Sequence, residues 1–119
     1  ERRPMPRDTL FLLPPGFAAN GQREFCPECA ELWGVLSWFP ALQETLDIVY
    51  VGIEHPRAPI TALLGDGRHN APTLVLHPAS SRAEGLPYSE ANGHAYLPSA
   101  RLIAKHFAGL HGTPVPRGS

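Results

Sequence analysis

The chain has 119 residues, of which 43% are hydrophobic and 18% are charged, and this ordinary globular composition excludes a wholly disordered or collagen-like chain. The 10 Lys and Arg residues against 11 Asp and Glu residues give a net charge of -1, so we expect no nucleic-acid partner. No apolar run approaches the roughly 18 residues of a membrane-spanning helix, so we expect no membrane association either.

The two ends of the chain differ in composition from the rest. Residues 1–7 and 112–119 are rich in Pro, Arg and Gly and poor in apolar side chains, which predicts flexible tails on either side of one domain over residues 8–111. The apolar run that follows the basic N-terminal residues is too short for the hydrophobic region of a signal peptide. We therefore expect a cytoplasmic protein.

The first half of the domain predicts a strand, a loop, a helix and a second strand. Residues 8–13 form a short apolar run closed by Pro14-Pro15-Gly16, which is typical of a buried strand. Residues 17–25 have no sustained period and are predicted to be a surface loop. A helix is predicted from Pro27 to Pro40, followed by a short helical turn over residues 41–46 and a strand over residues 47–53.

The second half predicts a short helix, two strands and a closing helix. Residues 59–64 fit a brief helix that ends at Gly65. Residues 73–77 and 94–97 are predicted strands, and residues 78–92 between them are predicted to be a loop. Residues 99–110 carry apolar side chains on one face and predict the last helix.

This order of elements, β-α-β-α-β-β-α, predicts an α/β fold with a mixed four-stranded sheet flanked by helices. The first strand-helix-strand unit requires a parallel crossover, and the last two strands are expected to pair antiparallel.

The two cysteines form the motif Cys26-Pro27-Glu28-Cys29 at the start of the first helix. Proline fits the first helical position, so Cys26 falls at the helix cap, where free backbone N–H groups and the helix dipole stabilise a thiolate. Cys29 follows about one helical turn later, with its sulfur within reach of Cys26. We therefore predict that Cys26 is the nucleophile and Cys29 the resolving thiol.

Three other readings of the cysteine pair remain open. The pair can be a plain buried disulfide or two packing thiols, although a bridge over two intervening residues constrains the unfolded chain little. A structural zinc site needs a second pair of ligands, and the six histidines have no metal-ligand spacing, so no metal ligands are assigned. Metal binding by Cys26 and Cys29 is the third reading, and a dimer interface is one way to supply four thiolates.

The motif and its context resemble a known family. Cys26-Pro27-Glu28-Cys29 at a strand-to-helix junction, with Asn70-Ala71-Pro72-Thr73 opening a later strand, is similar to the thioredoxin and glutaredoxin superfamily. The segment from Asp8 through the motif also resembles a small bacterial group of thioredoxin-like proteins without established function. The resemblance implies a thioredoxin-like fold, a redox-active dithiol, a cis-proline at Pro72, and substrate contacts at Pro27, Ala71, Pro72 and Thr73.

Several residues near the motif affect this hypothesis. Glutaredoxins carry Gly-Gly-x-Asp where this chain has Leu97-Pro98-Ser99-Ala100, so the glutathione element is not matched. The carboxylates of Glu24, Glu28 and Glu31 would oppose a thiolate nearby. His69 lies three residues before Pro72 and is a candidate proton carrier.

The remaining charged and aromatic side chains are expected to have ordinary roles. The other five histidines and the arginines Arg57, Arg68 and Arg82 are expected to be solvated, with Arg68 able to approach an anionic substrate. The two tryptophans, Trp33 and Trp38, point in different directions on the helix, so one can pack in the core while the other lies on the surface.

The function hypotheses differ in class. The first is a thiol-disulfide oxidoreductase that acts on a protein or a low-molecular-weight disulfide, glutathione included, without a cofactor. The second is a non-catalytic thioredoxin-fold binding module, and the third is metal binding through the two cysteines. The oligomeric state is left open.

Overall fold

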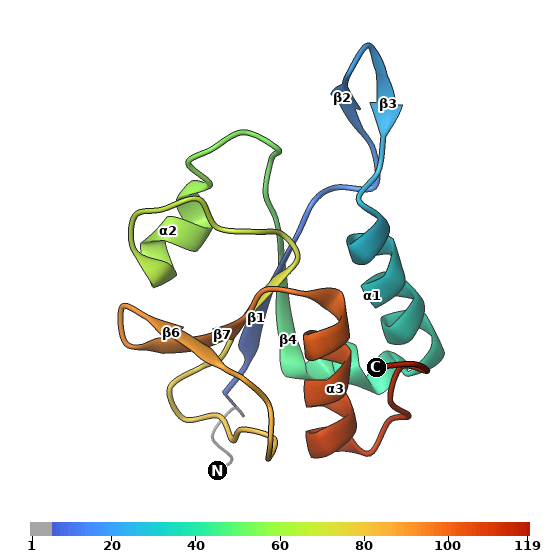
Figure 1. Cartoon of the computed structure of the whole chain (residues 1–119), viewed down its shortest axis with the longest axis vertical. Helices are drawn as coiled ribbons and strands as arrows, with labels where there is room; N and C mark the ends of the chain where they lie inside the picture. The colour runs from blue at the N-terminus through green and yellow to red at the C-terminus, as the bar shows by residue number, and fades with distance from the viewer. Residues whose placement is uncertain (1–5) are drawn as a thin grey trace.

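The computed structural model describes residues 6–119, so residues 1–5 of the predicted N-terminal tail lie outside it (Figure 1). Five strands form one sheet in the order β4-β1-β5-β7-β6, and a separate hairpin pairs β2 with β3. The sheet strands are β1 (Asp8–Leu12), β4 (Leu46–Tyr50), β5 (Thr73–Val75), β6 (Ser89–Ala91) and β7 (His94–Leu97). The helices are α1 (Pro27–Trp38), α2 (Ala58–Leu64) and α3 (Ala100–His111), with a 3-10 helix over Pro40–Thr45.

Strand β1 is an inner strand of the sheet, between β4 and β5. It runs parallel to β4 and antiparallel to β5, and β5 runs antiparallel to β7. Leu10, Phe11 and Leu12 are at most 1% exposed because neighbouring strands flank β1 and packed side chains cover both of its faces. The predicted α/β mixed sheet is thus confirmed, with the parallel first unit and the antiparallel later pair as expected.

The sheet has one strand more than predicted. Residues 78–92, expected to be a loop, contain β6, which pairs with β7 across a turn at Asn92 and Gly93. Both turn residues have positive φ, 49° and 78°, the conformation of a two-residue hairpin turn that suits Asn-Gly. A strand of three residues is too short to show a period of two, so the pattern could not reveal it.

The loop predicted over residues 17–25 is also a hairpin. Strands β2 (Phe17–Ala19) and β3 (Gln22–Glu24) pair across Asn20 and Gly21, whose φ values are 52° and 72°. The hairpin stands clear of the rest of the molecule beyond the first turn of α1 (Figure 1). The Asn-Gly signal was present in the sequence, but the strands around it lack the apolar alternation of a half-buried hairpin.

The helices pack their apolar residues into one core with the sheet. α1 and α3 lie side by side, while α2 lies apart from both (Figure 1). Ser99 caps α3, since its Oγ accepts a hydrogen bond from the Leu102 amide at 3.3 Å. No helix within residues 6–119 has the length and the apolar character that crossing a bilayer requires. The fully buried large side chains are Leu10, Phe11, Leu12, Leu32, Leu36, Ile60, Leu74, Val75, Leu97, Ile103, His106 and Phe107.

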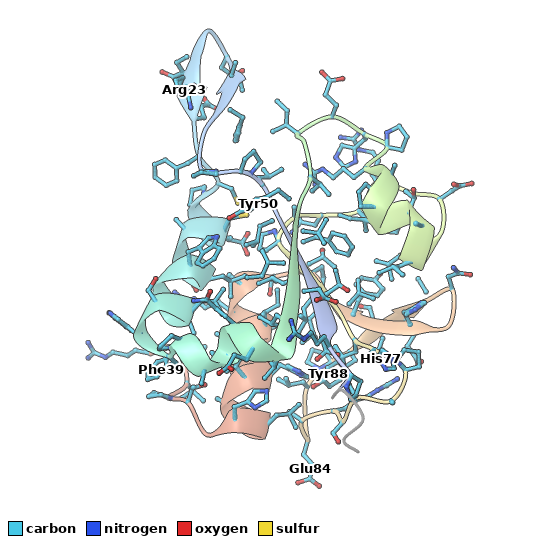
Figure 2. All side chains as sticks on the ribbon, turned by 180° about the vertical axis from the view of Figure 1, so that it is seen from behind. Arg23, Phe39, Tyr50, His77, Glu84 and Tyr88 are labelled. Carbon is cyan, nitrogen blue, oxygen red and sulfur yellow. The ribbon has the colours of Figure 1, made fainter. Side chains whose placement is uncertain are left out.

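A polar network joins β1 to α3 at the end of the molecule opposite the hairpin. Figure 2 shows His77 and Tyr88 at this end, far from Arg23 on the hairpin. The Nδ1 of the buried His106 ring lies within hydrogen-bond distance of the Tyr88 hydroxyl, at 2.7 Å, and that hydroxyl also accepts a hydrogen bond from the Ala83 amide. On its other side the ring lies 3.8 Å from the Asp8 carboxylate. Together these contacts hold the segment before β6 against α3.

Asp8 makes the stability of the fold depend on acid pH. Burial raises the pKa of Asp8, but His106, the Ser80 hydroxyl at 2.6 Å and the His77 amide at 2.8 Å outweigh burial and hold the pKa below its usual value. A lowered folded-state pKa contributes stability above the unfolded value, about 3.9, and this contribution is lost as the pH falls through the folded pKa.

We therefore expect Asp8→Asn to lower the free energy of unfolding by about 1–2 kcal/mol at pH 7. The difference from the wild type should shrink as the pH falls below about 4, because Asp8 is then protonated first in the unfolded chain and, at lower pH, in the folded chain. Urea unfolding at a series of pH values measures it. A difference that stays constant down to pH 3 would contradict the assignment.

Two helical glycines predict stability changes of opposite sign. A Cβ added at Gly109 in α3 would lie 2.6 Å from the Cβ of Ala83, whereas one added at Gly34 in α1 meets no atom within 4 Å. Both Gly→Ala changes gain helix propensity, about 0.5–1 kcal/mol. Gly34→Ala should therefore stabilise the protein by that amount, and Gly109→Ala should destabilise it by about 1 kcal/mol because overpacking outweighs the propensity. Thermal unfolding of the two variants checks both signs.

Candidate dithiol site

Cys26 is the cap residue of α1, with extended backbone angles of φ -80° and ψ 114°. Pro27 occupies the first helical position beside it. Proline has no N–H, and an N–H at this position would have no hydrogen-bond partner within the helix. The Cys26 Sγ accepts a hydrogen bond from the Cys29 amide at 3.2 Å. One of the free N–H groups of the first turn thus points at the Cys26 sulfur.

Cys29 lies one turn further into the helix and is only 4% exposed. Its Sγ accepts a hydrogen bond from the Leu13 amide at 3.4 Å, directly after β1. Both cysteines are free thiols, and they approach each other to 2.9 Å. The strand-to-helix junction therefore holds an accessible sulfur and a covered sulfur side by side.

The thiol of Cys29 has a pKa well above that of a free cysteine. Burial raises the pKa of Cys29 to about 12, and its hydrogen bond to Cys26 and the negative charges of Cys26 and Glu28 act in the same direction. The Leu13 amide acts in the opposite sense but does not offset them. Cys29 therefore keeps its proton at neutral pH, and its thiol hydrogen-bonds to Cys26.

The segment before β5 faces the dithiol. The Ala71 carbonyl oxygen lies 4.0 Å from the Cys26 Sγ, and the peptide bond between Ala71 and Pro72 is cis. Asn70 anchors this segment, because its side-chain amide donates to the Pro98 carbonyl at 2.7 Å. The fold thus brings Cys26, Cys29, Ala71 and the buried Pro72 together, although they come from segments over forty residues apart.

Thr73 and His69 are placed differently from the other candidate residues. The Thr73 hydroxyl donates to the Asn70 carbonyl at 2.6 Å, and the side chain is only 1% exposed, so it braces the loop. The His69 Nε2 lies 2.7 Å from the Gly65 carbonyl at the end of α2. Within residues 6–119 the His69 ring hydrogen-bonds to this carbonyl and to neither cysteine.

A pocket of about 300 Å³ opens next to both cysteines. The three residues that follow β1 line it together with the first half of α1 and the exposed Phe25. The sequence left open which of Trp33 and Trp38 packs in the core, and it gave the turn after β1 no role. The lining residues are Leu13, Pro14, Pro15, Phe25, Cys26, Cys29, Ala30 and Trp33. Apolar walls beside a reactive sulfur favour an apolar part of a substrate.

The three carboxylates expected to oppose a thiolate each have another partner. Glu28 accepts a hydrogen bond from the Ala100 amide at 2.9 Å, at the first turn of α3. Glu31 pairs with Arg101 at 3.2 Å, and Glu24 accepts from the amide side chains of the hairpin. Of these three carboxylates, Glu28 is the one whose negative charge helps to raise the pKa of Cys29.

Arg57 is a residue near the site that sequence reasoning missed. It was expected to be a solvated charge, but it is half-buried and bonded to three backbone carbonyls. Burial and the nearby Arg68 lower the pKa of Arg57. No short-range pattern marks it, because its partners Gly52, Ile53 and His69 come from two different loops.

Metal ligands are sparse around the dithiol. Within residues 6–119 no group of three or more His, Cys, Asp or Glu side chains is arranged to hold a metal ion. The two thiols are therefore the ligands that one described chain offers at this site.

Comparison with known proteins gives the family and nothing further. No curated protein and no solved structure matches the chain. A family model described as "Protein of unknown function (DUF3088)" matches residues 7–115, which is most of the chain. The chain belongs to the DUF3088 family.

Proposed function

We propose that this chain is a cytoplasmic thiol-disulfide oxidoreductase of the thioredoxin-like superfamily, with Cys26 as the attacking sulfur and Cys29 as the resolving sulfur. The observation that carries the proposal is the accessible Cys26 sulfur at the start of α1, bonded to the Cys29 amide at 3.2 Å and adjacent to a buried thiol. A disulfide between two residues so close in sequence is a weak structural staple, so reactivity is the better account of the pair.

The reaction proceeds in two exchanges of sulfur partners. The Cys26 thiolate attacks one sulfur of a substrate disulfide, and a Cys26–substrate disulfide forms while the other substrate sulfur leaves as a thiolate and takes up a proton. The Cys29 thiolate then attacks the Cys26 Sγ and releases the second substrate thiol. The substrate gains two electrons and two protons, and the protein is left with a Cys26–Cys29 disulfide that an external thiol must reduce.

The environment of Cys29 suits this order of events. Before the first exchange, burial and the charge and hydrogen bond of Cys26 hold the pKa of Cys29 at about 12, so Cys29 stays a thiol. Once Cys26 is tied up in the mixed disulfide, it carries no negative charge, and two of the causes that raise the pKa of Cys29 are removed. Deprotonation of Cys29 therefore becomes easier at the step that needs a second thiolate.

The surroundings support a protein disulfide or a small disulfide as the substrate. The apolar pocket next to Cys26 fits an apolar side chain, and an extended segment would lie along residues 70–72 opposite the dithiol. A low-molecular-weight disulfide such as glutathione needs less of this surface. The stretch Leu97-Pro98-Ser99-Ala100 stands where glutaredoxins carry their glutathione element, and here Ser99 caps α3.

Reduction of a protein disulfide tests the proposal. The full chain, kept reduced by dithiothreitol, should accelerate insulin reduction over the reductant alone, and Cys26→Ser should lose all of that acceleration. A small aromatic disulfide in a parallel assay separates a general dithiol from one that requires a protein substrate. A wild-type rate equal to the rate of the Cys26→Ser chain in both assays would reject the proposal.

A binding module is the second candidate function, and the burial of Cys29 favours it. Burial is the largest cause of its raised pKa and remains in the mixed disulfide, so if it keeps Cys29 protonated there, the chain would hold a captured partner rather than turn it over. Stoichiometric formation of a stable mixed disulfide by the wild-type chain, without turnover, would favour this candidate over the first.

A further inference from the structure

We infer that Arg57 is a positioning residue of the dithiol site, which holds the segment before Pro72 in place and presents an unneutralised positive charge to the Cys26 thiolate. This inference rests on the proposed function and deepens it, because it names what favours the charged form of the nucleophile besides the helix. It stands on the hydrogen bonds of one guanidinium and on the charges around it.

The guanidinium of Arg57 ties two loops together. Its Nε donates to the Gly52 carbonyl at 2.9 Å, and a terminal nitrogen lies 3.5 Å from the Ile53 carbonyl, both in the loop after β4. Its other terminal nitrogen donates to the His69 carbonyl at 3.0 Å. His69 lies two residues before Ala71, whose carbonyl faces Cys26, so this bond sets the backbone opposite the nucleophile. A planar fork with five donors makes such a three-carbonyl clamp, and a lysine does not.

The guanidinium of Arg57 bonds to backbone carbonyls and forms no ion pair with a carboxylate of residues 6–119. Within residues 6–119 no Asp or Glu oxygen lies within the 4.0 Å of an ion pair with this guanidinium. Backbone carbonyls solvate the charge but leave its sign unchanged. The guanidinium bonds to the His69 carbonyl, two residues before the Ala71 carbonyl that lies 4.0 Å from the Cys26 Sγ, so its charge lies on the side of the site that faces Cys26.

Both basic and acidic side chains surround the dithiol. On the side of Arg57 stand Arg68, His55 and His69: burial and the charge of Arg68 lower the pKa of Arg57, and burial and the charges of Arg57, Arg68 and His69 lower the pKa of His55. On the side of α1 and the hairpin stand Glu28 and Glu24, both engaged in hydrogen bonds elsewhere. Of these groups within residues 6–119, Arg57 is the one whose side chain hydrogen-bonds to the backbone of the segment that faces Cys26.

The pH dependence of Cys26 alkylation tests the inference in the full-length reduced chain. Iodoacetamide labelling is followed by peptide mass mapping, so that the Cys26 adduct is counted separately from Cys29. At pH 7, Arg57→Gln should slow labelling of Cys26 by about three- to tenfold and move the rate profile toward higher pH, as loss of a nearby opposite charge requires. Arg57→Lys keeps the charge and should stay within about twofold of the wild-type profile while insulin reduction slows several-fold.

Arg68→Gln is the matched control, since it removes an exposed positive charge from the same edge without touching the clamp. Its labelling rate should stay within about twofold of the wild type. An Arg57→Gln profile that coincides with the wild type would overturn the inference, whatever the insulin assay shows. If Arg57→Gln does not fold, Arg57→Lys decides: wild-type labelling together with wild-type reduction would show that the guanidinium fork does nothing for the site.

The two proposals fail in different ways. A wild-type chain that reduces no disulfide removes the proposed function, yet the labelling profiles still report whether Arg57 acts on Cys26. A chain that reduces disulfides with identical profiles for wild type and Arg57→Gln keeps the function and removes the role of Arg57.

Discussion

Cys29→Ser is expected to stop the reaction at the mixed disulfide. Cys26 stays at the start of α1 with its amide hydrogen bond, so the first exchange proceeds. The second exchange needs the sulfur that serine lacks. In a single turnover without added thiol, release of the second substrate thiol should fall by about a hundredfold or more, since only solution thiols can then resolve the bond.

Intact-protein mass spectrometry measures this result. The Cys29→Ser chain mixed with a small aromatic disulfide should gain the mass of one substrate half in nearly stoichiometric amount. The wild type should instead lose two hydrogens, and Cys26→Ser should remain unmodified. An adduct on Cys26→Ser of the same yield would reverse the roles of the two sulfurs, with the buried thiol as the nucleophile.

Phe107→Ala is expected to cost about 3–5 kcal/mol of the free energy of unfolding. The ring is 1% exposed on the buried face of α3, and its removal leaves a cavity that the fixed backbone of the sheet and helix cannot fill. Since a domain of this size has about 5–15 kcal/mol in total, the loss is a large share of its stability. We expect a fall in Tm of more than about 10 °C.

Trp38→Ala is the control, because it removes a larger aromatic side chain from the same protein. Trp38 is 79% exposed at the end of α1, so its loss should change the free energy of unfolding by less than about 1 kcal/mol. Urea unfolding of both variants measures the contrast. Equal losses would mean that the ring of Trp38 is covered in solution or that the core collapses around residue 107.

The sequence predicted the longer elements well because their patterns are local. The helix after Pro27 and the closing helix after Ser99 each have a start signal and an apolar stripe, and both signals act within one or two turns. The short strands β2, β3 and β6 were missed, since three residues carry no period. Their Asn-Gly turns were visible, but a turn alone does not say whether the flanking residues pair.

The features of the dithiol site were likewise predictable only where they depend on neighbouring residues. The placement of Cys26 at the cap follows from Pro27 and the apolar spacing beyond it, so it was predictable from four consecutive residues. The apolar pocket, the Glu28 bond to α3 and the Arg57 clamp were not, because each joins segments that the chain brings together only after folding. His69, by contrast, was expected near the dithiol from its sequence distance to Pro72, yet its ring bonds to the end of α2.

Taken alone, the amino-acid order determined the α/β class, the parallel first unit and a dithiol at the start of a helix, since secondary structure and capping depend on neighbours within a few residues. Tertiary packing decided how the two sulfurs differ. The burial of Cys29 beside the end of β1, which raises its pKa to about 12, and the Arg57 bond to the segment that faces Cys26 both arise from residues distant in sequence. Solvent exclusion and charge proximity are properties of the folded chain, and no window of sequence contains them.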